Sequence, residues 1–132
     1  KAAGLSNVHF LSLQPAERLN DLLNHADVHL LPQRADAADL VMPSKLPGML
    51  ASGRPIIAGA RETTQIAAEV AGAGVVVPPD NGNAMAEALR SLAADKEKRL
   101  RLGVEARKKA ISHWDREMVL AQLEARLLSL RN

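Results

Sequence analysis

Short apolar segments alternate with helical patterns four times along the chain, and this alternation limits the fold to a few architectures. The expected strands are residues 7–11, 27–32, 55–60 and 75–77. Helical patterns follow them at residues 15–26 and 44–53, from residue 63 or 64 to residue 72 or 74, and at 84–94, and two more helices are expected at 96–113 and 115–130. Thr63 or Thr64 is expected to begin the third helix, and the candidate caps of the fourth are Asp80, Asn81 and Asn83. Strands that alternate with helices are typical of a parallel sheet with helices on both faces. We therefore expect an α/β fold with a Rossmann-like parallel sheet, ending in two or three C-terminal helices.

The packing of this sheet can be anticipated from two patterns. The run of apolar residues at 75–77 has no polar break, as expected for a strand buried on both faces. Leu19, Leu22, Leu23 and Ala26 lie at the spacing of a helix face that packs against a core. With 132 residues, of which 47% are hydrophobic and 24% charged, the chain is expected to be one globular domain spanning residues 1–132.

Composition excludes several classes of function. Phe10 and Trp114 are the only Phe, Trp or Tyr residues, and this scarcity argues against binding of single-stranded nucleic acid by base stacking. Trp114 is expected to anchor the last helix. Cysteine is absent, which excludes disulfides and thiolate metal sites. No apolar run approaches the ~20 residues of a membrane span, and no signal-peptide pattern is visible, so a cytoplasmic location is expected. The histidines do not follow a metal-ligand spacing; they are His9, His25, His29 and His113.

Charge is distributed unevenly along the chain. Residues 1–89 contain six Lys and Arg against nine Asp and Glu, whereas residues 90–132 contain eleven against six. The C-terminal helices are therefore basic. A solvated helical face is the simplest interpretation, and contact with an anionic membrane surface is the alternative.

The stretch from residue 42 to residue 58 predicts a loop, a short helix and a buried strand. Ser44 is expected to cap the helix with its hydroxyl, and Pro47 falls in the first turn, where its missing N–H removes no internal bond. Gly53 is expected to end the helix in a left-handed conformation, before Pro55. The helix N-terminus then points out beyond the strand ends with Lys45 beside it, which suits a phosphate or another anion.

The order of these segments resembles the donor-binding half of the GT-B glycosyltransferases. The resemblance rests chiefly on Pro43-Ser44-Lys45-Leu46, followed by Met49-Leu50-Ala51-Ser52-Gly53-Arg54-Pro55. Other segments fit the same frame; they are Val8-His9-Phe10-Leu11, Ala26-Asp27-Val28-His29-Leu30-Leu31-Pro32, Gly74-Val75-Val76-Val77-Pro78-Pro79-Asp80 and Ser112-His113-Trp114-Asp115. The closest likeness is to family 4 retaining transferases of the bacterial colanic-acid and exopolysaccharide type.

This resemblance implies a C-terminal domain that holds a nucleotide-sugar donor by its base, ribose and diphosphate, without a metal or another cofactor. The acceptor would be a growing surface polysaccharide or a lipid-linked oligosaccharide at the cytoplasmic side of the inner membrane. The acceptor-binding N-terminal domain is missing from the chain, as are two strand–helix units with a glycine-rich loop and an Arg/Lys pair. The isolated chain is therefore expected to be inactive.

The resemblance also assigns site residues. Lys45 is expected to act in catalysis by neutralising the diphosphate that leaves as the glycosidic bond breaks. The residues expected to bind the donor are Leu13, Gln14, Pro43, Ser44, Lys45, Gly48 and Met49. No metal ligands are implied.

The chain departs from the family at an acidic pair that contacts the donor sugar and the ribose. The two positions fall at Leu40 and Gly48, and neither is acidic. Asp39 and Glu62 are the nearest carboxylates in the sequence and are the candidate substitutes. Two arginines at strand ends are expected to be surface residues, with a phosphate contact as the alternative; they are Arg34 and Arg61.

Two other functions fit an α/β chain of this kind. One is a nucleotide-sugar epimerase with the GT-B fold, although the catalytic acids and histidine set that it needs are not evident. The other is a non-catalytic, flavodoxin-like interaction module.

The chain begins at Lys1 with what resembles the end of a helix, so it is expected to be a fragment of a longer protein. In the common doubly wound strand order 3-2-1-4-5-6, residues 7–11 would form the edge strand and would lack their neighbours. We therefore expect the isolated chain to form a homodimer or to exchange a segment.

Overall fold

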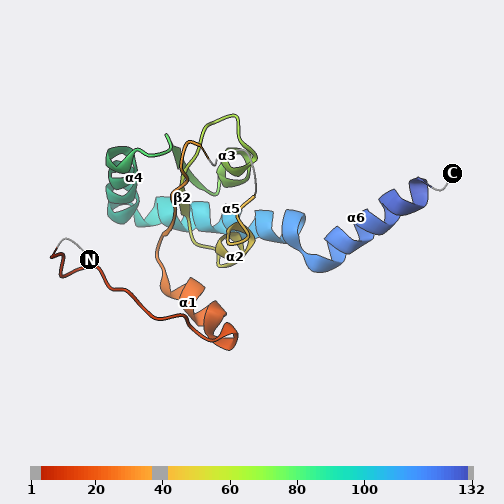
Figure 1. Cartoon of the computed structure of the whole chain (residues 1–132), viewed down its shortest axis with the longest axis horizontal. Coiled ribbons are helices and arrows are strands. Elements are labelled where there is room, and N and C mark those ends of the chain that lie inside the picture. The colour runs from red at the N-terminus through yellow and green to blue at the C-terminus, as the bar shows by residue number, and fades with distance from the viewer. Residues whose placement is uncertain (1–3, 37–41, 131–132) are drawn as a thin grey trace.

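A three-stranded parallel sheet forms the centre of the protein (Figure 1). In the computed structural model, residues 4–36 and 42–130 are described. The strands are β1 (His29–Leu31), β2 (Ile56–Gly59) and β3 (Gly74–Val77), and they lie in the order β1-β2-β3. His29 is paired with Ile56, and Ile56 with Gly74, so all three strands begin at the same edge of the sheet.

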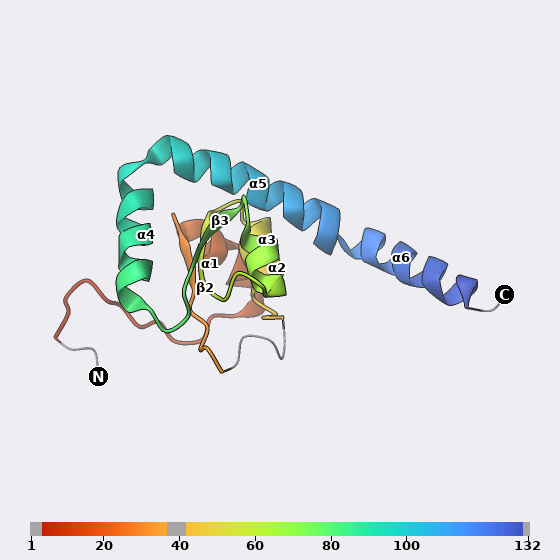
Figure 2. The ribbon, with the colours of Figure 1, turned by 90° about the horizontal axis from the view of Figure 1, so that it is seen from above.

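Helices cover both faces of this sheet, as predicted. The helices that follow the strands are α2 (Leu46–Ala51), α3 (Gln65–Val70) and α4 (Gly82–Ala94), and α5 (Lys96–Trp114) comes next. Figure 2 shows α4 on one side of the strands and α2 and α3 on the other, with α5 crossing beside them. Ile56 and Ala58 of β2 pack into the cluster with α2 and α3, whereas Ile57 packs into the cluster with α4. This alternation follows from the period of two in a strand.

Side-chain caps set the start of four helices. The hydroxyl of Thr64 accepts a hydrogen bond from Ala67 N–H at the start of α3, and the amide oxygen of Asn81 accepts one from Ala84 N–H in α4. Asp95 and Asp115 cap α5 and α6 (Arg116–Ser129) in the same way. Thr64 was one of two predicted starts of α3, and Asn81 was one of three candidate caps of α4. Both are confirmed, because this chemistry is local to the sequence.

The strand predicted at residues 7–11 is wrong. This segment has no regular structure, and Phe10 is 81% exposed. Among the described residues no strand lies beside it, and a strand without a partner is not stable. The buried helix face predicted around Leu19 and Leu22 is also wrong, since the 3-10 turn η1 (Ala16–Arg18) and α1 (Leu19–His25) bury no residue. Full burial of residues 75–77 is corrected too, because β3 lies at the sheet edge and only Val77 is buried.

Basic side chains of α5 contact the C-terminal ends of three other helices. Arg99 donates to the carbonyl oxygens of Leu92 and Ala93 in α4, at 2.5 and 2.8 Å. The guanidinium of Arg107 donates to the carbonyl of Ala51, the last residue of α2, at 2.5 Å. Cations at a helix C-terminus satisfy free carbonyls and interact favourably with the negative end of the helix dipole. Three of the eleven Lys and Arg residues at 90–132 therefore contact the ends of other helices within the fold.

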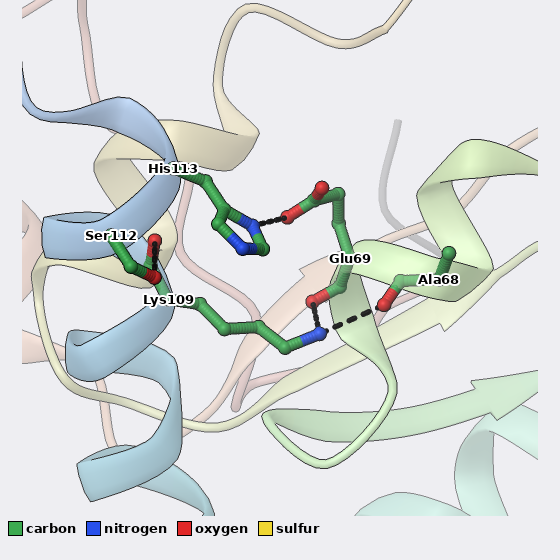
Figure 3. A network of polar contacts seen from close by, with 5 residues as sticks. All are labelled: Ala68, Glu69, Lys109, Ser112 and His113. Atoms are coloured by element: carbon green, nitrogen blue, oxygen red, sulfur yellow. Dashed lines mark hydrogen bonds and ion pairs between the residues drawn. The ribbon is translucent and has the colours of Figure 1, made fainter. Parts of the chain in front are cut away.

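The third of these contacts is shown in Figure 3. Lys109 donates to the carbonyl oxygens of Ala68 and Glu69 in the last turn of α3, at 2.8 and 3.0 Å. The ring of His113 lies 3.1 Å from the carboxylate of Glu69, one turn further along α5. Trp114, the last residue of α5, packs against the core just beyond them, but the last helix that it was expected to anchor, α6, buries no residue. These contacts fix the end of α5 before the chain turns into α6.

Helix α6 extends away from the rest of the molecule (Figures 1 and 2). It buries none of its residues, and its exposed leucines include Leu123 and Leu127. None of the helices within residues 4–36 and 42–130 combines the length and apolar character that crossing a membrane requires.

Candidate functional site

The N-terminal end of α2 lies beyond the carboxyl edge of the sheet, where ligands bind in open α/β folds. The chain enters α2 through a tight turn in which Leu46 N–H donates to the carbonyl of Pro43, at 3.0 Å. Lys45 is the first flanking residue, with helical φ and ψ of −76° and −26°. The predicted cap at Ser44 is therefore wrong: the backbone already turns at Lys45, and no side chain in the described part of the chain caps this helix.

This end of α2 presents positive charge to solvent. Ser44 and Lys45 are exposed, while the neighbouring Leu46 is fully buried and fixes the turn to the core. Pro47 occupies the first turn, as predicted, and has no N–H. The next N–H, that of Gly48, finds no acceptor among the described residues. An ammonium, an unpaired N–H and the positive end of a short helix thus lie together, an arrangement that suits an anion.

The C-terminal end of α2 differs, because each of its last four carbonyls has a donor. Gly48 O accepts from Ser52 N–H, and Leu50 O accepts from Gly53 N–H. Met49 O accepts from the Ser52 hydroxyl at 2.6 Å, and Ala51 O accepts from Arg107. Gly53 has φ of +67°, the left-handed conformation predicted for it.

A buried histidine supports this end from β1. His29 is 7% exposed, and its Nε2 lies 2.9 Å from the Ser52 hydroxyl. Because that hydroxyl gives its one proton to Met49 O, it accepts from the imidazole N–H and from Arg54 N–H. Burial, together with the positive charge of Arg54, lowers the pKa of His29. His29 is therefore a structural residue, and the described residues contain no cluster of metal-ligating side chains.

The other residues expected to bind the donor are placed in different surroundings. Met49 is half-buried and packs against the core, and Pro43 is half-buried in the entry turn. A Cβ at Gly48 would lie 3.3 Å from Leu23 Cδ1, so α1 packs closely against this position. Gln14 lines a separate hollow of about 210 Å³ beside α1, and Leu13 is fully exposed. Asp39 and Leu40 lie outside the described residues.

A second hollow of about 420 Å³ lies at the strand ends, on the face of the sheet covered by α4. Its polar lining includes Gln33, Arg34, Asp80 and Asn81. Arg34 is paired with Asp36 through two contacts of 2.7 and 3.1 Å, so its charge is already matched. Arg61 and Glu62 line a neighbouring hollow of about 280 Å³.

Asp80 is a residue whose role the sequence did not reveal. It has φ of +56°, a conformation that few residues other than glycine adopt. Its carboxylate accepts a hydrogen bond from Ala35 N–H at 2.8 Å and so ties the loop after β3 to the loop after β1. The sequence suggested Asp80 only as a helix cap. In the sequence, only its position directly after a strand and two prolines indicates a turn with an unusual backbone conformation at Asp80.

Comparisons with known proteins agree on the kind of protein this is. Residues 1–95 match the family model described as glycosyl transferases group 1. Over 90 residues the chain is 37% identical to the colanic acid biosynthesis glycosyl transferase WcaI of Escherichia coli K12, covering 66% of this chain and 22% of that protein. Among solved structures, sucrose-phosphate synthase of Thermosynechococcus elongatus aligns with a TM-score of 0.73 at 23% identity, over 92% of this chain and 30% of that one. The chain thus spans about a fifth of its curated relative, and the structural match confirms the predicted Rossmann-like fold.

Proposed function

The chain belongs to the group 1 glycosyl transferase family, and we propose that it is the donor-binding half of a retaining glycosyltransferase. In this proposal residues 1–132 form one truncated Rossmann-like domain whose α2 end holds the diphosphate of a nucleotide-sugar. The observation that carries it is the asymmetry of α2. Its carbonyl end is fully paired, whereas its N-terminal end offers Lys45 and the N–H of Gly48 at the carboxyl edge of the sheet.

The proposed mechanism gives Lys45 an electrostatic role. As the bond between the anomeric carbon and the diphosphate breaks, negative charge accumulates on the leaving phosphate oxygens. The Lys45 ammonium and the positive end of α2 stabilise that charge in the transition state. The exposed hydroxyl of Ser44 is within the same turn and is proposed as a further donor to the phosphate. Leu13 and Gln14 are proposed to hold the base, and Pro43, Gly48 and Met49 to shape the site around the donor.

The acceptor is proposed to bind to an N-terminal domain supplied by the same protein, because the chain spans only 22% of WcaI. We propose, from the resemblance of the sequence to the exopolysaccharide transferases, that the acceptor is a growing surface polysaccharide or lipid-linked oligosaccharide and that the protein acts in the cytoplasm with peripheral contact at the inner membrane. The isolated chain is proposed to dimerise or exchange a segment through its exposed residues 7–13, which light scattering would test.

The test of the donor site is a titration of nucleoside diphosphates into the full-length protein, followed by calorimetry. Replacing Lys45 with alanine removes one charge-assisted contact, and we expect Kd to rise about tenfold. Lys108→Ala is the matched control, since Lys108 is an exposed lysine paired with Glu105 on α5. Its affinity should be unchanged.

Other outcomes would point to other functions. An unchanged affinity in Lys45→Ala would overturn the role of Lys45. Failure of every nucleoside diphosphate and nucleotide-sugar to bind the wild-type protein would favour a non-catalytic module. Turnover of UDP-N-acetylhexosamine without any acceptor would favour an epimerase.

A further inference from the structure

Helix α2 is too short to be stable, or to keep a fixed orientation, without the elements that pack against it. It has six residues, or about 9 Å of helix, and isolated helices below about 12 residues are marginal in water. Its orientation therefore depends on the elements packed against it. Buried Leu46 fixes the entry turn to the core, and the direction of the helix that follows Lys45 depends further on what holds its other end.

Two elements hold the other end, β1 through His29 and Ser52, and α5 through Arg107 and Gly103. Arg107 donates to Ala51 O at the last residue of α2. Four residues earlier on α5, Gly103 lies against the backbone of Gly53. A Cβ built at Gly103 would be 2.2 Å from Gly53 O, so the two backbones are as close as glycine allows. One polar contact and one backbone contact thus fix the C-terminal end of α2 to a 19-residue helix.

The same helix caps α3 and α4, but those two helices are also fixed at their N-terminal ends. Thr64 caps the start of α3 and Asn81 caps the start of α4. Among the described residues, α2 alone of these three helices begins without a side-chain cap. Without Arg107, α2 would have neither a cap at its start nor a donor at Ala51 O, whereas α3 and α4 would keep the caps at Thr64 and Asn81 without Lys109 or Arg99.

We infer that Arg107 is a positioning residue for the donor diphosphate: by holding the C-terminal end of α2 it sets where Lys45 and the Gly48 N–H lie. This inference rests on the function proposed above for Lys45. Arg107 itself does not touch the ligand in this arrangement, because it contacts the opposite end of the helix. It acts through geometry, and a small misplacement of a charged group is enough to weaken its interaction with a phosphate.

The test uses Arg107→Gln in the full-length protein, with nucleoside diphosphate affinity and Tm measured together. We expect Kd to rise about fivefold, the size of effect typical of residues that act through packing. Arg99→Gln and Lys109→Gln are the matched controls, since each removes the same kind of helix-end contact from α4 or α3. They should lower Tm by a similar amount and leave Kd within about twofold. Arg107→Lys keeps a cation and should restore most of the affinity.

A double variant separates positioning from general destabilisation. If Arg107 acts through Lys45, then Arg107→Gln combined with Lys45→Ala should bind little worse than Lys45→Ala alone. Full additivity, or equal loss of affinity in all three glutamine variants, would overturn the inference while leaving the donor site intact. If Arg107→Gln does not fold, the same comparison is made with Arg107→Met, which removes the donor but keeps an unbranched side chain. Absence of binding in the wild-type protein would instead overturn the proposed function.

Discussion

Helices α5 and α6 follow one another in the chain and behave in opposite ways. Helix α5 contains seven Lys and Arg residues but buries Leu102, Gly103, Ala106 and Ala110. Helix α6 is richer in leucine and buries nothing, and it extends from the body as Figure 2 shows. The more apolar of the two helices is therefore the exposed one.

The difference shows what allows a helix to pack here. In α5 small residues line the buried face, so the helix approaches the backbone at Gly53 closely. Long cationic side chains then reach past that face to the carbonyl ends of α2, α3 and α4. Helix α6 is more apolar than α5 but stays exposed, because the described residues offer no surface on which it packs.

The largest expected effect compares one leucine from each helix. Leu102→Ala should lower the free energy of unfolding by about 2–4 kcal/mol, because it empties space in the cluster between β2, β3 and α4. Leu123→Ala in α6 should change it by less than about 0.5 kcal/mol, because Leu123 is 53% exposed. Urea denaturation of both variants measures the contrast. Similar losses would mean that α6 is packed in solution.

A glycine replacement should have the next largest effect. Gly103→Ala should cost about 2 kcal/mol despite the better helix propensity of alanine, because the new methyl group would collide with Gly53 O. Gly82→Ala, at the start of α4, is the control, since a Cβ there meets nothing within 4 Å. It should be neutral or slightly stabilising. A neutral Gly103→Ala would show that α5 does not approach α2 so closely.

The smallest effect is expected from a change of pH, which should lower the stability of the sheet and the helices packed against it but not act on α6. The pKa of His29 is lowered from 6.5 in the folded state, so the unfolded chain takes up the proton first. Above about pH 6.5 neutral His29 makes its full contribution to the free energy of unfolding. This contribution is lost as the pH falls from 6.5 towards the lowered pKa of the folded state. Urea midpoints measured from about pH 8 to about pH 5 should decline. The His29→Gln variant should lose this part of the slope, and an identical slope would contradict the assignment.

The sequence predicted the parts of the fold that depend on local chemistry. Thr64 and Asn81 were identified as helix starts because a cap needs only its own first turn, and Gly53 was identified because few residues adopt its φ. Residues 7–11 were predicted as a strand from their pattern, but a strand also requires a neighbour that a pattern does not supply.

The candidate site was predictable to a similar extent. The exposed position of Lys45 at the start of a short helix followed from the prolines and glycines around it. The missing cap at Ser44 depends on the geometry of one turn, which the residue types alone do not determine. The role of Arg107 was hidden because nothing in the sequence distinguishes it from the other basic residues of α5. Its partner Ala51 lies 56 positions away.

The contact between Gly53 and Gly103 bears on how this protein can be engineered. The two glycines resist substitution for different reasons: Gly53 has a positive φ that other residues rarely adopt, whereas at Gly103 there is no space for a Cβ. If the residues of α2 were grafted onto another scaffold without α5, Gly103 would be missing and the short helix would lose the packing contact that holds its C-terminal end. The smallest portable unit is therefore α2 together with α5, and a library that varies either helix should hold both glycines fixed.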